Sequence, residues 1–378
     1  MKIYCISEGE LHEYNCDSGK ETAVTCNRVS EYFDTIRKMK QRDEWKTTGK
    51  GAQFMGVEEK HYAETTVNGE AMLRFCTVCG DRLIYSTFFD GVGGMYFKDK
   101  DDEQYIFANG ESDINGISCR GGKCAVSCGQ GMYESHIAAV DTEKGYINQL
   151  TEGFTSEKHP FISRRNENII YYTAMGYARN QSGAVLEKSP CSICTYDEKT
   201  GELCELVQSD EYDYIKPQDD KDGNLYYIRR KYEPTKKKGN LGLDILLFPV
   251  RIIKAIGGFL SMFSMAFGGE PLRTGGNNPA KSRAADERKL FVEGNLINAE
   301  KQLSADSDGG IIPSGWVLIK RSTDGEEAVI KKGIMDYYIS DCGEIICSDG
   351  SWVRLIHTDG KEEKLCRLKL ANSISVME

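Results

Sequence analysis

The segment CTYDEKTGELCEL, residues 194–206, contains the pattern that decides the fold of this 378-residue chain. A β-rich run ends in Asp, a short polar turn closes on Gly, and a second β-rich run follows. Asp and Gly favour tight hairpin turns, because Asp bonds to nearby backbone and Gly adopts positive φ. Similar turns occur six times, at Asp17–Gly19, Asp99–Asp102, Asp141–Gly145, Asp197–Gly201, Asp324–Gly325 and Asp359–Gly360. An internal repeat of this kind predicts an all-β repeat architecture.

A second hairpin precedes five of these six turns. Its turns lie at Gly80-Asp81, Gly121-Gly122, near Asn166, at Asp222-Gly223 and at Gly343. Each unit is therefore predicted to be a four-stranded antiparallel sheet. The chain begins inside a second strand, Ile3–Ser7, so the tail Ala371–Met377 is the expected donor of the missing first strand. We expect a six-bladed β-propeller closed by pairing of the C-terminal strand with the first blade; the alternative is an open stack of hairpins with exposed edges.

The repeat resembles the six-bladed β-propellers of the TolB-like and low-density-lipoprotein-receptor types. The best-matching segments are residues 169–173, residues 194–206 and LYYIR at residues 225–229. The likeness covers most of the chain at the level of the repeat. It implies a propeller fold and a scaffold role, but it transfers no activity, because one fold serves many functions.

The charge of the chain argues against a nucleic-acid partner. Lys and Arg number 48 and Asp and Glu number 58, for a formal net charge of −10. An acidic chain repels the phosphate backbone, and no basic stretch interleaved with aromatic residues offsets this. Because each unit of a repeat leans on its neighbours, residues 1–378 are predicted to form a single domain.

The N-terminus and the cysteines predict a cytoplasmic location. Residues 1–5 enter a strand directly, without the charged and apolar regions of a secretion signal. Most of the fourteen cysteines lie within apolar strand runs, as Cys5, Cys124, Cys194 and Cys347 do. Free cysteine in such runs behaves as a small buried hydrophobic residue, which suits a reducing compartment.

Residues 29–69 interrupt the repeat after the first blade and are predicted to form a helix and a loop. Within Ser30–Trp45 the apolar residues recur at helical spacing, with Ser30 as the expected N-cap. These apolar residues are Tyr32, Phe33, Ile36 and Met39. We expect a surface helix that packs this stripe on the propeller; partner binding is the alternative.

Residues 233–312 form a longer insertion within the fifth blade. It opens with Lys236–Lys238, continues into the apolar segment Leu243–Phe267, and passes into a Gly/Asn/Pro-rich linker at 268–282. The apolar segment is predicted to be a helical arm that binds a protein partner or a membrane surface. Its candidate binding residues are Leu246, Phe248, Ile252, Ile253, Ile256, Phe259, Leu260, Phe263 and Phe267.

Three possibilities remain open for what this apolar face contacts. The arm packs back onto the propeller, docks on a protein or a second copy of the chain, or makes peripheral membrane contact. Stable spanning of a bilayer is not supported. Asp244, Arg251 and Lys254 would cost roughly 8–10 kcal/mol at mid-membrane, and the apolar residues return only roughly 5–10 kcal/mol.

Motifs for chemistry are absent from the sequence. The five histidines are scattered, and neither a nucleophile elbow nor a zinc-protease motif occurs. Cys76-x-x-Cys79 and Cys191-x-x-Cys194 fall in different blades, while Cys119, Cys124 and Cys128 share one hairpin and could cluster. We therefore predict a non-enzymatic scaffold without metal or cofactor. The alternative is a propeller that binds a small ligand, or performs catalysis, in its central channel, which would require polar residues from several blades to meet there.

Overall fold

The computed structural model describes residues 1–43, 71–89, 92–99, 102–109, 113–130, 133–179, 185–234, 289–292, 295–298 and 310–377. Within these ranges the regular structure is almost entirely β-strand, accompanied by one helix. The strands form four-stranded antiparallel groups, which we number in chain order.

Groups 1 to 3 come from the first part of the chain and from its last strand. Group 1 pairs in the order β26 (Asn372–Met377), β1 (Lys2–Ser7), β2 (Glu10–Asn15), β3 (Lys20–Val24). Group 2 contains β4 (Ala71–Cys79), β5 (Arg82–Phe89), β6 (Val92–Asp99) and β7 (Asp102–Asn109). Group 3 contains β8 (Ile114–Arg120), β9 (Lys123–Gln130), β10 (Glu134–Asp141) and β11 (Tyr146–Gln149).

Groups 4 to 6 follow the same plan. Group 4 contains β12 (Ser156–Ile162), β13 (Ile169–Arg179), β14 (Val185–Asp197) and β15 (Glu202–Val207). Group 5 contains β16 (Tyr212–Asp219), β17 (Leu225–Lys231), β20 (Val317–Arg321) and β21 (Glu327–Lys332). Group 6 contains β22 (Asp336–Ile339), β23 (Ile345–Ser348), β24 (Val353–Ile356) and β25 (Glu362–Cys366). A parallel bridge between Ser135 and Ser156 joins groups 3 and 4 into one eight-stranded sheet.

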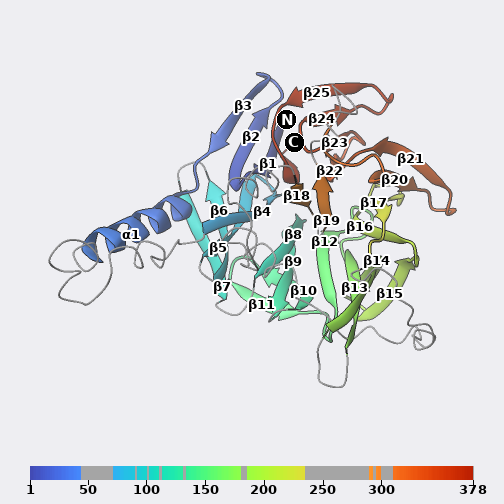
Figure 1. Ribbon diagram of the computed structural model, residues 1–378, viewed down its shortest axis with the longest axis horizontal. Coiled ribbons are helices and arrows are strands. Elements are labelled where there is room, and N and C mark those ends of the chain that lie inside the picture. Colours follow the sequence, from blue (N-terminus) through green and yellow to red (C-terminus); the bar gives the residue numbers. More distant parts are fainter. Residues whose placement is uncertain are drawn as a thin grey trace, which may run out of the picture.

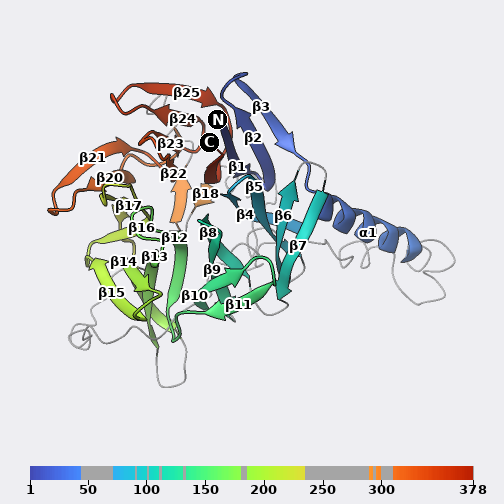
Figure 2. The same cartoon turned by 180° about the vertical axis from the view of Figure 1, so that it is seen from behind.

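The groups are arranged around a common centre, as Figures 1 and 2 show from opposite sides. The first strand of each group, which we call its inner strand, faces that centre; these are β26, β4, β8, β12, β16 and β22. The two termini lie side by side, because β26 pairs antiparallel with β1. The last strand of the chain thus completes the group that the first strand begins.

The six predicted turns each join two paired strands, so the hairpin prediction is confirmed. Asp141 shows the local cause: its Oδ1 accepts hydrogen bonds from the backbone N–H groups of Glu143 and Lys144, at 3.1 Å and 3.0 Å. Gly145 then closes the turn with φ of 70°, a conformation that favours glycine. Its position is also crowded, because a Cβ there would lie 2.5 Å from the carbonyl oxygen of Ile106.

Buried tyrosines fill the spaces between neighbouring groups. Tyr172 of β13 packs among residues of groups 3 and 4, such as Ile137, and Tyr227 of β17 packs among residues of groups 4 and 5, such as Ile193. Both tyrosines are fully buried. These two tyrosines therefore supply packing between neighbouring groups.

Helix α1 (Asn27–Asp43) lies in the first predicted insertion and begins three residues earlier than Ser30. The Ser30 N-cap prediction is wrong, because the carboxylate of Glu103 in β7 accepts the backbone N–H groups of Asn27 and Arg28, at 2.7 Å and 2.9 Å. A carboxylate from another group therefore takes the place of a local cap at the positive end of the helix.

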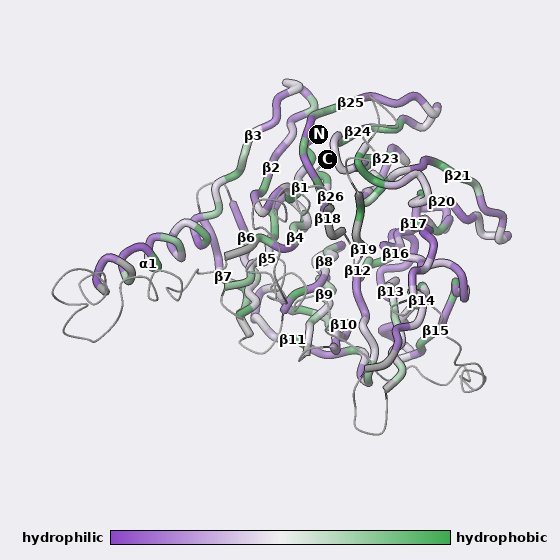
Figure 3. Tube along the Cα trace, viewed as in Figure 1, coloured by the Kyte–Doolittle hydropathy of each residue, from purple (hydrophilic) through white to green (hydrophobic). Residues whose placement is uncertain are grey.

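The apolar stripe of α1 is only partly packed. Tyr32 stacks on Phe89 of β5 with ring centroids 4.7 Å apart, but Phe33 and Met39 are 44% and 47% exposed. The helix projects away from the sheets in Figure 1, and Figure 3 shows mostly hydrophilic residues along it. The prediction of packing on the propeller is thus right for Tyr32 and wrong for Phe33 and Met39.

The second predicted insertion separates β17 from β20 in group 5. Of its residues the structure describes mainly the antiparallel hairpin β18 (Lys289–Val292) and β19 (Asn295–Asn298). Ile297 of this hairpin is buried in the same core cluster as Ile311 and Trp316. Across the described ranges, no helix has the length and apolar character needed to cross a bilayer.

Candidate functional site

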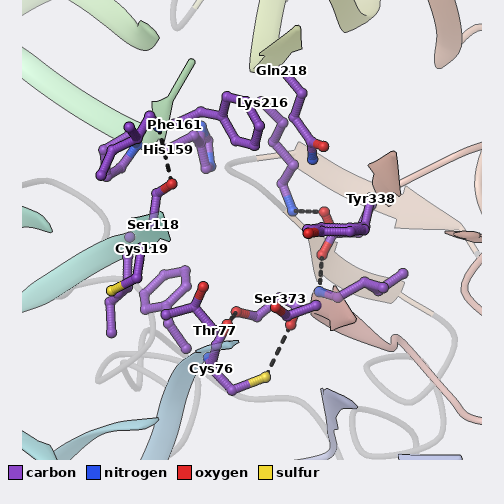
Figure 4. Close-up of a pocket in the computed structure, with 18 of the residues that line it drawn as sticks. Cys76, Thr77, Ser118, Cys119, His159, Phe161, Lys216, Gln218, Tyr338 and Ser373 are labelled. Carbon is purple, nitrogen blue, oxygen red and sulfur yellow. Dashed lines mark hydrogen bonds and ion pairs between the residues drawn. The ribbon is translucent and has the colours of Figure 1, made fainter. Parts of the chain in front are cut away.

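A cavity of about 120 Å³ lies among the inner strands, and all six of them contribute to its lining. Figure 4 shows this central cavity with labelled residues from different groups, among them Ser118, His159, Lys216 and Ser373. A single water molecule requires roughly 10–15 Å³ of such space, so the cavity has room for a polar group of a ligand or partner.

Three lining residues have a backbone conformation that side chains disfavour. His159, Lys216 and Ser373 have φ values of 52°, 55° and 53°. Each lies where the register of an inner strand shifts, in β12, β16 and β26. A β-bulge redirects side chains locally, and left-handed backbone at a non-glycine residue costs about 1–2 kcal/mol. Strain that recurs around one cavity motivates the hypothesis that the cavity is functional.

A buried ion pair joins two inner strands at the cavity. Lys216 Nζ lies 3.1 Å from Asp336 Oδ1, and the two side chains are 10% and 7% exposed. The carboxylate of Asp336 also accepts the backbone N–H groups of Tyr337 at 2.9 Å and Ile374 at 3.3 Å. These additional hydrogen bonds offset the desolvation of the pair. The pair therefore links β16, β22 and β26 and holds its charges in place.

Arg164 is the most deeply buried cation at the cavity, with a side chain only 1% exposed. Its guanidinium donates to backbone carbonyl oxygens of β16 and β22. It also lies over the rings of Phe161 and Tyr338, at 4.8 Å and 4.9 Å from their centroids. Carbonyl groups and rings stabilise a cation without neutralising it. Asp341 Oδ1 lies 3.5 Å from Arg164 Nε.

Asp341 gathers three cations, of which Arg120 and Arg164 line the cavity. Both carboxylate oxygens lie 3.4 Å from the guanidinium of Arg120, and Lys221 Nζ lies 3.2 Å from Oδ2. Burial alone would raise the pKa of Asp341, but the hydrogen bonds to Arg120 and Lys221 outweigh it and lower that pKa. We call Arg120, Arg164, Lys221 and Asp341 the basic cluster; three positive charges and one negative charge leave it at +2.

Hydrogen bonds between side chains and backbone connect neighbouring inner strands. Ser373 Oγ accepts the N–H of Cys76 at 2.8 Å and donates to the carbonyl oxygen of the same residue at 2.9 Å. Ser118 Oγ accepts the N–H of Ile162 at 3.0 Å. Gln218 donates to one backbone carbonyl of β22 at 2.7 Å and accepts one N–H at 3.2 Å. The walls of the cavity are thus linked across group boundaries.

The structure leaves the predicted binding residues untested and brings together residues that the sequence did not single out. Leu246, Phe248, Ile252, Ile253, Ile256, Phe259, Leu260, Phe263 and Phe267 lie outside the described residues. The cavity residues fall in segments that the sequence assigned to first strands, and the channel was the alternative site. The available signal was a charge within an apolar strand, as at Lys216.

The described residues do not place three or more His, Cys, Asp or Glu side chains so that they could hold a metal ion. Cys76, one of the sequence candidates, donates its thiol to the carbonyl oxygen of Ser373 at 3.0 Å. Burial raises the pKa of that thiol well above its ordinary value. Cys76 is therefore neutral at physiological pH and suited to packing.

Comparison with known proteins supports the fold. No family model and no curated protein matches the chain. The structure is similar to TolB from Acinetobacter baumannii, with a TM-score of 0.52 at 8% identity, covering 99% of this chain and 66% of that one. It is also similar to the tricorn protease (TM-score 0.39, 13% identity, 96% and 38% covered) and to a puromycin-hydrolyzing peptidase of Mycobacterium tuberculosis (TM-score 0.40, 13% identity, 79% and 46% covered).

Only the first similarity is close enough to carry an argument, and at this identity it shows the fold alone. The chain has a TolB-like β-propeller fold and spans 66% of the matched TolB chain. The TolB-like part of the predicted resemblance is therefore confirmed. The low-density-lipoprotein-receptor type is not supported by these similarities.

Proposed function

We propose that this TolB-like propeller is a non-enzymatic interaction scaffold whose central cavity receives an acidic group of a protein partner. The observation that carries the proposal is the charge of the cavity. Among the described residues, its lining includes the cations Arg120, Arg164 and Lys216 and the anion Asp336, in a chain whose net charge is −10. Cations gathered against the overall charge of a protein favour an anionic ligand.

The proposed architecture is six blades closed into one ring. The pairing of β26 with β1 supports closure, because a strand from the C-terminal end of the chain completes the group that the N-terminal strand begins. The hydrogen bonds of Ser373 with Cys76 support it as well, since they connect group 1 to group 2 across the position of closure. A rigid ring would hold the basic cluster in a fixed geometry for binding.

A carboxylate is the chemistry that best fits the basic cluster. Arg120 already contacts both oxygens of Asp341, and an arginine fork recognises a carboxylate in this two-point manner. With a charge of +2, the cluster can accept a second carboxylate beside Asp341. Acidic side chains of a protein partner supply that group at a size that a cavity of about 120 Å³ admits.

The side chains at the cavity favour binding over catalysis. An activated nucleophile needs a neighbouring base or a lowered pKa. Cys76 has a raised pKa, and the amine of Lys216 is paired with Asp336. His159 Nδ1 lies 3.3 Å from the hydroxyl of Thr173, but Thr173 does not line the cavity and its hydroxyl also accepts the backbone N–H of Lys216 at 3.2 Å. These contacts support the non-enzymatic proposal.

The test is the binding of a fluorescein-labelled hexaglutamate peptide, followed by fluorescence anisotropy at low and physiological salt. Arg120→Gln removes one cation of the basic cluster. We expect at least about tenfold weaker binding, because a charge-assisted hydrogen bond contributes about 1.5–3 kcal/mol. Arg37→Gln is the matched control, since Arg37 on α1 is exposed, forms an ion pair with Asp34 and does not line the cavity.

Equal loss in both variants, or no peptide binding by the wild-type protein, would refute the cavity as the acceptor. Competition by free glutamate separates the two kinds of ligand. If free glutamate displaced the peptide at equal concentration, the small-ligand alternative would replace the protein-partner proposal. Displacement only by the peptide supports the scaffold.

The apolar arm remains a second proposed contact, resting on the composition of residues 243–267. In this proposal the ring presents the arm to a protein groove, a second copy or a membrane surface, in the cytoplasm. The test is deletion of residues 236–282 in the full chain. If assembly size by light scattering and flotation with liposomes were both unchanged, the arm would have no docking role.

A further inference from the structure

Three cysteines of groups 2 and 3 form a thiol cluster. Cys79 is the last residue of β4, and Cys119 lies in β8 directly opposite Cys124 of β9 in the strand register. The side chains of Cys79 and Cys119 pack against the same core cluster, which contains Cys124, and each of the two thiols shifts the pKa of the other. All three are free cysteines. Two of them, Cys79 and Cys119, come from neighbouring groups that share no strand ladder.

A wide groove gives solvent access to this cluster. It has a volume of about 980 Å³, and Cys79 and Cys124 lie in its wall together with Arg82 and Lys123. Cys119 lines the central cavity instead. A small reagent in the groove therefore has access to Cys79, whereas Cys119 does not line the groove.

The surroundings of the two thiols divide their roles. The hydrogen bond from Cys119 lowers the pKa of Cys79 to about 7, further helped by the positive charge of Arg82. Burial raises the pKa of Cys119 well above its ordinary value. The thiolate is the nucleophile in disulfide exchange, so Cys79 attacks and Cys119 stays protonated until a disulfide forms beside it.

We propose that Cys79 is a thiol–disulfide exchange site for low-molecular-weight disulfides, with Cys119 as its resolving thiol. The Cys79 thiolate attacks one sulfur of the disulfide, so a mixed disulfide forms and one small thiolate leaves. The thiol of Cys119 then transfers its proton to that thiolate and attacks Cys79 Sγ. A bond between Cys79 and Cys119 forms, the second small thiolate leaves, and the small disulfide is reduced to two thiols.

The product would link β4 to β8 covalently at the boundary between groups 2 and 3. This chemistry does not depend on the binding of an acidic partner, because neither sulfur belongs to the basic cluster. Formation of this disulfide would make the boundary between groups 2 and 3 respond to the thiol–disulfide state of the surroundings.

The expected rate advantage of Cys79 follows from its thiolate fraction. At pH 7 about half of a thiol with pKa about 7 is ionised, against about 3% for an ordinary thiol of pKa about 8.5. The lower nucleophilicity of the weaker base offsets roughly fivefold of this gain. Cys79 should therefore react about threefold faster than an ordinary exposed thiol at pH 7, and about sixfold faster at pH 6.

The experiment uses the full chain and the neutral probe 2-hydroxyethyl disulfide. The reaction is quenched by alkylation at several times, and peptide mass spectrometry follows each cysteine. In the wild-type protein we expect a Cys79–Cys119 disulfide, with Cys204 as the internal control because it is exposed and lies outside the cluster. In Cys119→Ser the mixed disulfide on Cys79 should accumulate, and in Cys79→Ser Cys119 should stay reduced.

The wild-type measurement decides the proposal even if a variant fails to fold. The proposal is overturned if Cys204 reacts as fast as Cys79 at both pH values. It is also overturned if Cys79 is oxidised to a cysteine other than Cys119. Retention of the mixed disulfide in the wild-type protein, without release of the second thiol, would refute the resolving role of Cys119.

Discussion

Replacement of Glu103 by Gln should weaken the interactions that attach α1 to the propeller. The side chain of Glu103 is only 2% exposed and lies 3.1 Å from Lys98 Nζ, which is also buried. Its carboxylate accepts the hydroxyl of Tyr85 at 2.6 Å as well as the first two N–H groups of α1. One carboxylate thus neutralises a buried cation and caps a helix from another part of the chain.

We expect Glu103→Gln to destabilise the protein by about 3 kcal/mol. Breaking a buried ion pair by removal of one partner costs about 3–5 kcal/mol, because the remaining charge stays desolvated. The Gln side-chain oxygen can still accept one of the helix N–H groups, which places the loss at the lower end. A second substitution, Lys98→Met, removes the stranded cation and should restore about 2 kcal/mol of the loss.

The assay is urea unfolding followed by far-ultraviolet circular dichroism, with amide hydrogen exchange in the first turn of α1. Glu327→Gln is the matched control, since Glu327 accepts the hydroxyl of Tyr227 in the same way but its side chain is 33% exposed. We expect that control to lose under about 1 kcal/mol. Equal losses in both variants, or no recovery with Lys98→Met, would refute the role assigned to Glu103.

The pH dependence gives a second readout of the same carboxylate. Burial alone would raise the pKa of Glu103, but hydrogen bonds from Tyr85, the helix N–H groups and Lys98 outweigh it, and the pKa is lowered. A lowered native pKa contributes stability above the unfolded pKa of about 4.3, and the contribution is lost as pH falls through the native value. The difference between wild type and Glu103→Gln should therefore shrink below about pH 4.

Three further predictions concern other sites. Asp341→Asn should strengthen binding of the hexaglutamate peptide, because it frees the surrounding cations; unchanged anisotropy titrations would contradict this. Gly145→Ala should destabilise the protein by about 2 kcal/mol or more and Gly201→Ala by about 1 kcal/mol. Both glycines have φ of 70°, but of the two only Gly145 is crowded by backbone. Thermal unfolding compares the two variants, and equal losses would argue against crowding. The hydrogen bond that His357 donates to the Glu344 carboxylate raises the pKa of His357, so the stability it contributes is present at low pH and is lost as pH rises through that raised pKa. In proton NMR titration Glu344→Gln should return the pKa of His357 toward about 6.5, and an unchanged midpoint would contradict the assignment.

The sequence by itself determined the hairpins, because their causes are local. In the turn at Asp141 the carboxylate bonds to N–H groups two and three residues ahead, and glycine supplies the positive φ that follows. The alternation of apolar and polar residues then predicts a strand on each side of the turn. The start of α1 escaped this reasoning, since its cap, Glu103, lies 76 residues beyond Asn27.

Only the tertiary structure decided which side chains meet at the centre. The hydroxyl of Tyr337 donates to the backbone carbonyl oxygen of Lys216, which lies 121 residues earlier in the chain. Neither sequence segment indicates that it will lie beside the other. Bulges in the inner strands add to the difficulty, because a shift of one residue reverses the face to which every later side chain points. The repeat therefore predicted the strands of each group, whereas the basic cluster and the thiol cluster depend on contacts between groups that no local pattern records.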